Sequence, residues 1–158
     1  MFREMQRKKR AMTRSECIAL LKRETRGVLS VLGDEGYPYG TPLNHYYCEE
    51  DGKLYFHGGK QGHRLDAVRR CDKASFCVYD AGWREANEWA FNVRSVIVFG
   101  RIEVIEDRET VYAISRALSR KFTDDEAYID SEIARSGPGT LLLAMTVEHM
   151  TGKQVKEC

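Results

Sequence analysis

The chain has 158 residues, of which 42% are hydrophobic and 31% are charged, and this balance favours one folded domain with its own core over a disordered chain. The formal net charge of +1 argues against a general nucleic-acid binder. No apolar run reaches the ~20 residues of a membrane span and the charged N-terminus lacks the apolar core of a signal peptide, so we expect a cytoplasmic protein with no membrane contact.

The first predicted element is a helix over residues 14–24, which follows an N-terminal arm of residues 1–12. Thr13 and Glu16 have the spacing of a capping box, and Ile18, Leu20 and Leu21 follow it. Four cations in a row at 7–10 are weak support for an anion-binding arm, so we interpret them as solvated. We expect one domain over residues 13–150 and a tail over 151–158.

Three strands are predicted next, over residues 28–32, 39–48 and 53–57. Turn signals separate them, Gly-Asp-Glu-Gly at 33–36 and Glu-Glu-Asp-Gly at 49–52, because glycine supplies positive φ and acidic residues supply local hydrogen bonds. Strands joined by such short turns predict an antiparallel meander.

The second half of the chain continues this alternation of short elements. We expect a helix at 60–70, a strand at 74–79, a loop at 80–88, a strand at 93–105, a helix at 107–121, a helical or irregular stretch at 123–136 and a strand at 140–147. Gly100, inside the longest strand, predicts a bulge or a sharp bend.

Strands linked mainly by hairpins must hide their sheet edges, so the sequence predicts a mainly β fold with flanking helices, a small antiparallel barrel of six or more strands. No G-x-G-x-x-G motif follows a strand and no P-loop lysine motif is present, which excludes the helix-flanked nucleotide-binding folds. The five cysteines contain no closely spaced pair, so we expect free thiols and no metal site.

A glycine-rich loop after the strand at 53–57 is the candidate functional site. It carries Lys60, His63 and Arg64 where the next helix is expected to begin. Cations and free backbone N–H groups at a helix start are typical of a phosphate site. Arg64 could equally pair with Asp66 or another neighbouring acid, and both readings stay open.

Three segments in this order, 36–44, 54–66 and 94–100, resemble the FMN-binding split-barrel superfamily, whose best-known member is pyridoxamine 5′-phosphate oxidase. The resemblance extends over roughly residues 10–150 and is closest to the nitroimidazole-resistance (Nim-like) branch. It implies a homodimer in which FMN lies in clefts between the subunits, with Trp83 or Trp89 closing the cleft from the partner.

The resemblance also implies site residues. The flavin contacts carried over by motif are Thr41, Pro42, Leu43, Asn44, His57, Lys60, His63 and Ser95. The residues at 41–44 would follow the flavin ring through backbone groups, Lys60 and His63 would reach the phosphate, and His57 would be the catalytic proton donor. His45 alternates with Asn44, so only one faces the site, and the motif favours Asn44.

The implied function is an FMN-dependent oxidoreductase that passes electrons to a small electrophile such as a nitroaromatic. A non-enzymatic flavin carrier or redox sensor, and a split barrel that binds haem or a deazaflavin, are the alternatives. The chain lacks the C-terminal Arg- and His-bearing segment of the oxidase, so vitamin B6 synthesis is not expected. Its loop reads Lys-Gln-Gly-His where the oxidase has adjacent Arg and Lys, which leaves fewer fixed charges for the phosphate.

Overall fold

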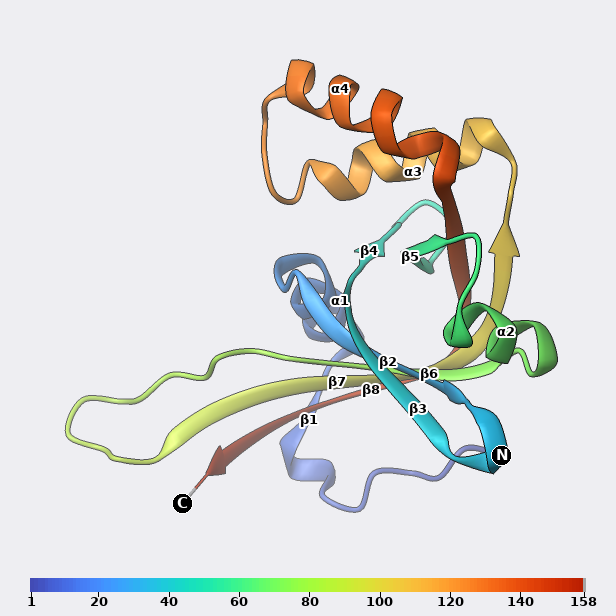
Figure 1. Cartoon of the computed structure of the whole chain (residues 1–158). Helices are drawn as coiled ribbons and strands as arrows, with labels where there is room; N and C mark the ends of the chain where they lie inside the picture. The colour runs from blue at the N-terminus through green and yellow to red at the C-terminus, as the bar shows by residue number, and fades with distance from the viewer. Residues whose placement is uncertain (158) are drawn as a thin grey trace.

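A strongly curled antiparallel sheet dominates the computed structural model, which describes residues 1–157 (Figure 1). Its strands are β1 (Ala11–Met12), β2 (Arg26–Leu32), β3 (Pro38–Asn44), β4 (Tyr46–Tyr47), β5 (Lys53–Gly59), β6 (Lys73–Tyr79), β7 (Phe91–Ile105) and β8 (Thr140–Glu157). The α-helices are α1 (Arg14–Arg23), α2 (His63–Arg70), α3 (Arg108–Ser119) and α4 (Glu126–Ser136), with 3₁₀ turns at Lys8–Arg10, Asp34–Gly36 and Gly137–Gly139.

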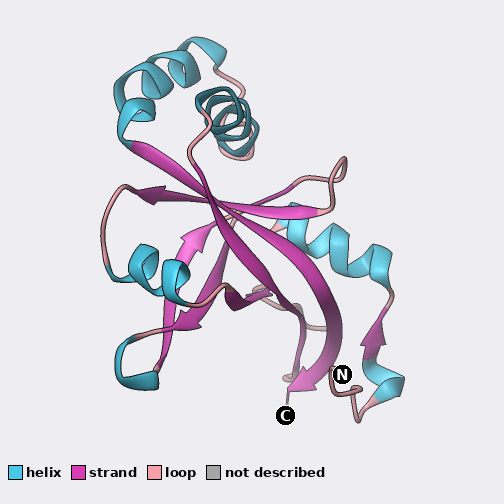
Figure 2. Cartoon of the chain, turned by 90° about the vertical axis from the view of Figure 1, so that its right-hand side faces the viewer, coloured by secondary structure: helices cyan, strands magenta, loops and turns pink. Residues whose placement is uncertain are grey.

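The strand order explains the half-barrel shape. Neighbouring strands run β3-β2-β6-β7-β8-β5-β4, and β1 pairs with β8 outside this path. The two end strands, β3 and β4, are separated only by His45 in the sequence, so the sheet must curl back toward its own start (Figure 2). This arrangement confirms the predicted mainly β split barrel, with eight strands.

The predicted meander is bent at His45. The strand expected over 39–48 divides, and its first part pairs with β2 while Tyr46 and Tyr47 pair with β5. The strand bends here because the His45 side chain points into the sheet interior, where it is fully buried and contacts the ring of Phe76. His45 therefore has a structural place, as its position opposite Asn44 suggested.

Side-chain alternation places the core inside the curl. Phe56, Phe76, Val96 and Val98 have no exposed surface, and they come from β5, β6 and β7. Helix α1 covers this core with Cys17, Leu20 and Leu21, and the capping box predicted at its start is present. A smaller cluster lies on the other side of β5 and β8, beneath α3.

Two predicted boundaries were wrong, each for a visible reason. Helix α2 begins at His63 and not at residue 60, because β5 continues to Gly59 through its pairing with β8. Strand β8 runs to Glu157 and not to 147, since its second half is polar and its pairing with β7 cannot be recognised from hydrophobic alternation. The bulge predicted at Gly100 is confirmed by the register shift between Phe99 and Gly100.

The four described cysteines, Cys17, Cys48, Cys71 and Cys77, are free thiols as predicted, and Cys158 lies outside the described residues. Within residues 1–157, no helix is both long and apolar enough to cross a bilayer. No cluster of three or more potential metal ligands occurs in that part of the chain.

Candidate functional site

A cavity of about 210 Å³ lies where β3, the end of β5, the start of α2 and β8 meet. Its apolar wall is formed by Leu65, Leu141 and Leu143. Its polar wall is formed by the backbone around Gly58 and Gly59, the start of α2, and side chains from β3.

The start of α2 leaves backbone donors uncapped at this cavity. Gly62 is the N-cap residue and no side chain accepts from the first turn. Its φ of +124° belongs to the region that favours glycine, and a Cβ at this position would meet no atom within 4 Å. The first N–H groups of a helix have no partner within it, so this end of α2 attracts an anion.

Thr41 brings an unsatisfied polar atom to the same cavity. Its Oγ1 is buried and has no hydrogen-bond partner among the described residues. The alternation of β3 places this side chain on the inner face, opposite the buried Leu29. Because an unpaired buried hydroxyl costs roughly 1–3 kcal/mol, this position favours a ligand that completes its bonding.

Two cationic or potentially cationic side chains flank the uncapped turn. Nη2 of Arg64 donates to the carbonyl of His57 at 3.4 Å, a long bond that leaves most of the guanidinium donors free. No ion pair joins Arg64 to Asp66 in the described chain, so this alternative is excluded. The ring of His63 stacks on Tyr39, with centroids 4.1 Å apart and planes inclined by 28°.

The cavity is thus rich in donors. None of the described residues that line it carries a carboxylate. The polar set comprises a guanidinium, an imidazole, the hydroxyls of Thr41 and Tyr39, the amide of Gln61 and free backbone N–H groups. This composition suits an anionic group with several acceptor oxygens, such as a phosphate.

The predicted flavin contacts at 41–44 do not all reach the cavity. Thr41 lines the cavity, whereas Pro42, Leu43 and Asn44 lie beyond it along the strand. Oδ1 of Asn44 accepts from Nε of Arg26 at 3.3 Å. Of this segment, the structure brings only Thr41 to the cavity.

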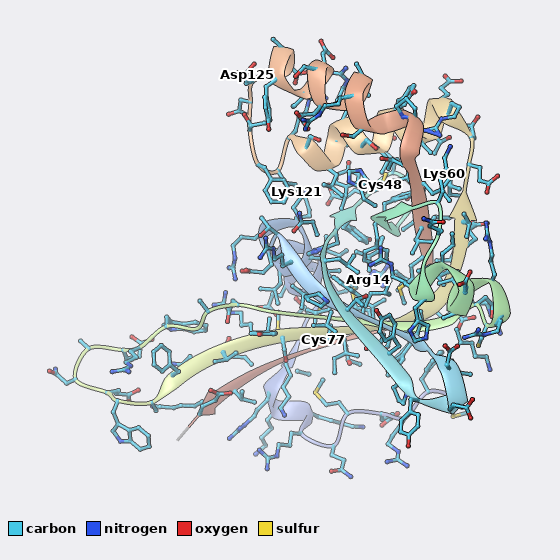
Figure 3. All side chains as sticks on the ribbon, viewed as in Figure 1. Arg14, Cys48, Lys60, Cys77, Lys121 and Asp125 are labelled. Atoms are coloured by element: carbon cyan, nitrogen blue, oxygen red, sulfur yellow. The ribbon has the colours of Figure 1, made fainter. Side chains whose placement is uncertain are left out.

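The two predicted phosphate ligands are also separated. His63 lines the cavity, while Lys60 is exposed on the loop between β5 and α2 and does not line it (Figure 3). Lys60 makes no hydrogen bond or ion pair with the described residues.

His57 points away from the cavity. Its neighbour Tyr55, two residues earlier on the same face of β5, packs in the cluster beneath α3. Nε2 of His57 and Oγ of Ser115 on α3 lie 3.0 Å apart, and burial lowers the pKa of His57. Only its backbone carbonyl contacts a cavity residue, so this geometry gives no support to His57 as the proton donor.

Ser95 lies on β7, and the two tryptophans lie in the loop between β6 and β7. Ser95 pairs with Tyr79 and Lys153 and does not line the cavity. Trp83 forms a bridge with Asn92 beneath the guanidinium of Arg94, and Trp89 is 71% exposed.

Among the polar side chains that line the cavity, those of Tyr39, Gln61 and Arg64 are missing from the predicted flavin contacts. The sequence did indicate Arg64, because this residue stands beside His63 at the predicted helix start. Tyr39 could be inferred only from its position two residues before Thr41, since this spacing puts both side chains on one face of a strand.

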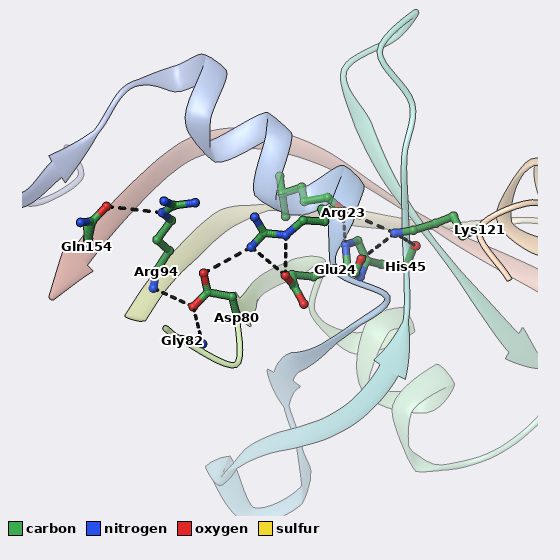
Figure 4. Close-up of polar contacts among 9 residues, drawn as sticks. Arg23, Glu24, His45, Asp80, Gly82, Arg94, Lys121 and Gln154 are labelled. Carbon is green, nitrogen blue, oxygen red and sulfur yellow. Dashed lines mark hydrogen bonds and ion pairs between the residues drawn. The ribbon is translucent and has the colours of Figure 1, made fainter. Parts of the chain in front are cut away.

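A second buried polar cluster joins α3 to α1 and β4 (Figure 4). Nζ of Lys121 donates to the carbonyls of Glu24, His45 and Leu21 at 2.7, 3.0 and 3.4 Å. Nε2 of His45 lies 2.7 Å from the same Leu21 carbonyl, to which it must donate. Burial lowers the pKa of Lys121 to about 8, and burial together with the charge of Lys121 lowers the pKa of His45 to about 4.

Comparison with known proteins places this geometry in a wider group. Residues 13–154 match the family model described as pyridoxamine 5′-phosphate oxidase. No curated protein matches the sequence.

Solved structures share the fold at low sequence identity. A candidate 5-nitroimidazole antibiotic resistance protein from Bacteroides thetaiotaomicron has a TM-score of 0.76 and 19% identity, over 93% of this chain and 87% of that one. An FAD-binding protein from Mesorhizobium loti has a TM-score of 0.65 and 21% identity, over 92% and 97%. An FAD and haem binding protein from Mycobacterium smegmatis has a TM-score of 0.69 and 23% identity, over 89% and 70%.

Proposed function

Since the chain belongs to the pyridoxamine 5′-phosphate oxidase family, we propose that it binds FMN and that the cavity at Thr41 holds the phosphate of this cofactor. The observation that carries the proposal is the buried, unpartnered Oγ1 of Thr41 beside the uncapped start of α2. Arg64 supplies the positive charge, and the exposed Lys60 lies on the loop between β5 and α2. These residues fit a phosphate because every charged group among them is a cation and the free backbone groups are donors.

The size of the cavity supports a shared site. At about 210 Å³ it is smaller than the roughly 300–1,000 Å³ usual for small-molecule sites. It has room for the phosphate end of FMN, and the rest of the cofactor would extend beyond it. We therefore propose that a second copy of the chain completes the site.

The outer face of the sheet is the surface proposed for this second copy. Tyr79, Ile97 and Phe99 project from it with 63, 41 and 40% of their surface exposed, while Val96 and Val98 between them are fully buried. Neighbouring apolar side chains left exposed on one sheet face mark an interaction surface. Ser95 lies on the same face by its pairing, which would bring it to the dimer contact.

A bound flavin would supply the electron transfer, and the chain would supply binding and orientation. The donors of the cavity would hold the phosphate end in place. The position of the phosphate would then determine the direction in which the rest of the bound cofactor extends from the cavity. The proposed activity is reduction of a small electrophile, for example a nitroaromatic, with electrons from a separate reductant. His57 is not included, because its side chain is held by Ser115 on the far side of β5.

The test is the absorbance spectrum of the purified protein, before and after incubation with FMN, FAD and riboflavin. The proposal predicts an oxidised-flavin spectrum in the copurified or reconstituted protein, and it fails if no flavin binds. Turnover of a nitro compound with NAD(P)H then separates an enzyme from a carrier, since a carrier retains flavin without turnover. A Soret band without flavin would support the haem alternative.

A further inference from the structure

One nitrogen of His63 is occupied by the backbone of a distant turn. The N–H of Asp34 donates to Nε2 of His63 over 3.2 Å. An N–H group can only donate, so Nε2 must present its lone pair and carry no proton. The contact therefore determines the chemistry of the other ring nitrogen.

The Asp34 carboxylate does not compete for this nitrogen. Its Oδ2 lies 3.6 Å from Nε2 of His63, beyond hydrogen-bond range, while its Oδ1 accepts from Arg70 at 2.6 Å. Gly33 allows the close approach, since a Cβ there would lie 3.2 Å from Nε2. The backbone group, and not the acidic side chain, therefore contacts the ring.

The orientation of the ring is fixed by a second contact. Tyr39 stacks on it at 4.1 Å, which opposes rotation of the imidazole out of the plane that the Asp34 N–H selects. A neutral imidazole has one proton, and with Nε2 as acceptor that proton resides on Nδ1. Nδ1 has no hydrogen-bond partner among residues 1–157.

We propose that Asp34 is a positioning residue whose backbone N–H fixes neutral His63 as the Nδ1–H tautomer, and so makes His63 a hydrogen-bond donor in the phosphate cavity. The ligand named here rests on the proposed function, whereas the tautomer does not. With His63 as a donor, the cavity recognises an acceptor-rich anion without first protonating the ring. A ligand that offers only donors at this point, such as an ammonium group, would be disfavoured.

His45 provides an internal comparison. Its Nε2 faces the carbonyl of Leu21, which can only accept, so His45 must be the Nε2–H tautomer. One chain thus contains two histidines whose tautomers are set in opposite directions by backbone groups.

The test is a ¹⁵N-histidine NMR spectrum of the flavin-free protein at a pH where the His63 ring is neutral, with His63→Gln and His45→Gln used to assign the signals. The proposal predicts Nδ1–H for His63 and Nε2–H for His45. An Nε2–H ring at His63 would overturn it, whether or not the protein binds flavin.

A pair of variants tests the positioning role itself. Asp34→Asn keeps the N–H and loses the carboxylate, whereas Asp34→Pro loses both. The Asp34 N–H makes no backbone hydrogen bond among the described residues, so the bond to His63 is the only hydrogen bond of this N–H that proline removes. We expect Asp34→Asn to retain the Nδ1–H tautomer, and Asp34→Pro to move toward Nε2–H and to bind FMN about 3- to 10-fold more weakly than Asp34→Asn.

Equal tautomers in the two variants would overturn the role of Asp34. If Asp34→Pro does not fold, the wild-type spectrum still decides the tautomer. If the tautomer is as predicted and FMN does not bind at all, the proposed function fails and the positioning by Asp34 stands.

Discussion

Two groups of polar residues in this fold differ in how far the chain itself satisfies them. In the cluster around Lys121, one ammonium donates to three carbonyls and the ring of His45 shares one of them, which leaves only Nδ1 of His45 buried without a partner among the described residues. At the cavity, the hydroxyl of Thr41 is buried without a partner and the first turn of α2 is uncapped.

The difference separates a structural role from a binding role. Lys121 connects the end of α3 to the C-terminal end of α1, where helix carbonyls lack partners of their own. The donors of the cavity that have no partner among the described residues are available to a bound ligand. We therefore expect changes at Lys121 and His45 to alter stability, and changes at Thr41 and Arg64 to alter ligand affinity.

The largest expected effect is acid destabilisation at His45. Its folded-state pKa of about 4 lies below the ordinary value of 6.5, so the unfolded chain binds the proton first as the pH falls. Stability is therefore lost between these two values, by about 3 kcal/mol once both are passed. Urea unfolding at a series of pH values measures this, and His45→Gln should flatten the dependence; an unchanged slope would contradict the assignment.

Loss of the Lys121 ammonium should have the next largest effect. Lys121→Met removes the donor to three carbonyls and should lower the free energy of unfolding by about 2 kcal/mol, with little change in FMN affinity. The matched control is Lys22→Met, because Lys22 forms an exposed ion pair with Glu49 worth roughly 0–1 kcal/mol. Equal destabilisation by the two variants would remove the distinction between the two polar groups.

A change at Arg64 should affect FMN affinity much more than the free energy of unfolding, the reverse of the expectation for Lys121. Arg64→Gln removes the cation at the cavity and should weaken FMN binding about 10- to 30-fold, while urea unfolding without flavin changes by less than about 0.5 kcal/mol. Arg69→Gln, on the same helix but near Glu106 at 3.9 Å, is the control and should leave the affinity unchanged. If both variants bind FMN like the wild type, the phosphate does not occupy this cavity.

The smallest effect, and the most specific, is expected at Thr41. Thr41→Val removes a buried hydroxyl that has no partner, so the flavin-free protein should be as stable as the wild type or up to about 1 kcal/mol more stable. FMN affinity should fall about 3- to 5-fold, since the ligand loses this contact. A clear loss of stability without flavin would mean that the hydroxyl already has a partner.

The sequence predicted most of the fold, because the required signals are local. Turn residues located the hairpins, a capping box located α1, and Gly100 located the bulge. It did not predict the second half of β8, where a polar strand is stabilised by its pairing with β7. It also did not show that the strand at 39–48 divides at His45, since that bend depends on burial of the imidazole in the core.

The site was predictable only in part. The glycine loop and His63 could be recognised from residue type and spacing. Whether a strand residue faces inward depends on register, so Thr41 could not be distinguished from Asn44, nor could the side of β5 on which His57 lies. The link from Asp34 to His63 joins residues 29 positions apart and leaves no local pattern.

The central claim is that the Thr41 cavity binds the phosphate of a flavin, and it is tested most directly by calorimetric titration of the flavin-free protein with FMN and with riboflavin. The two ligands differ only in the phosphate. The account predicts that FMN binds at least about 30-fold more tightly, a difference of about 2 kcal/mol. Equal affinities, or tighter binding of riboflavin, would contradict it.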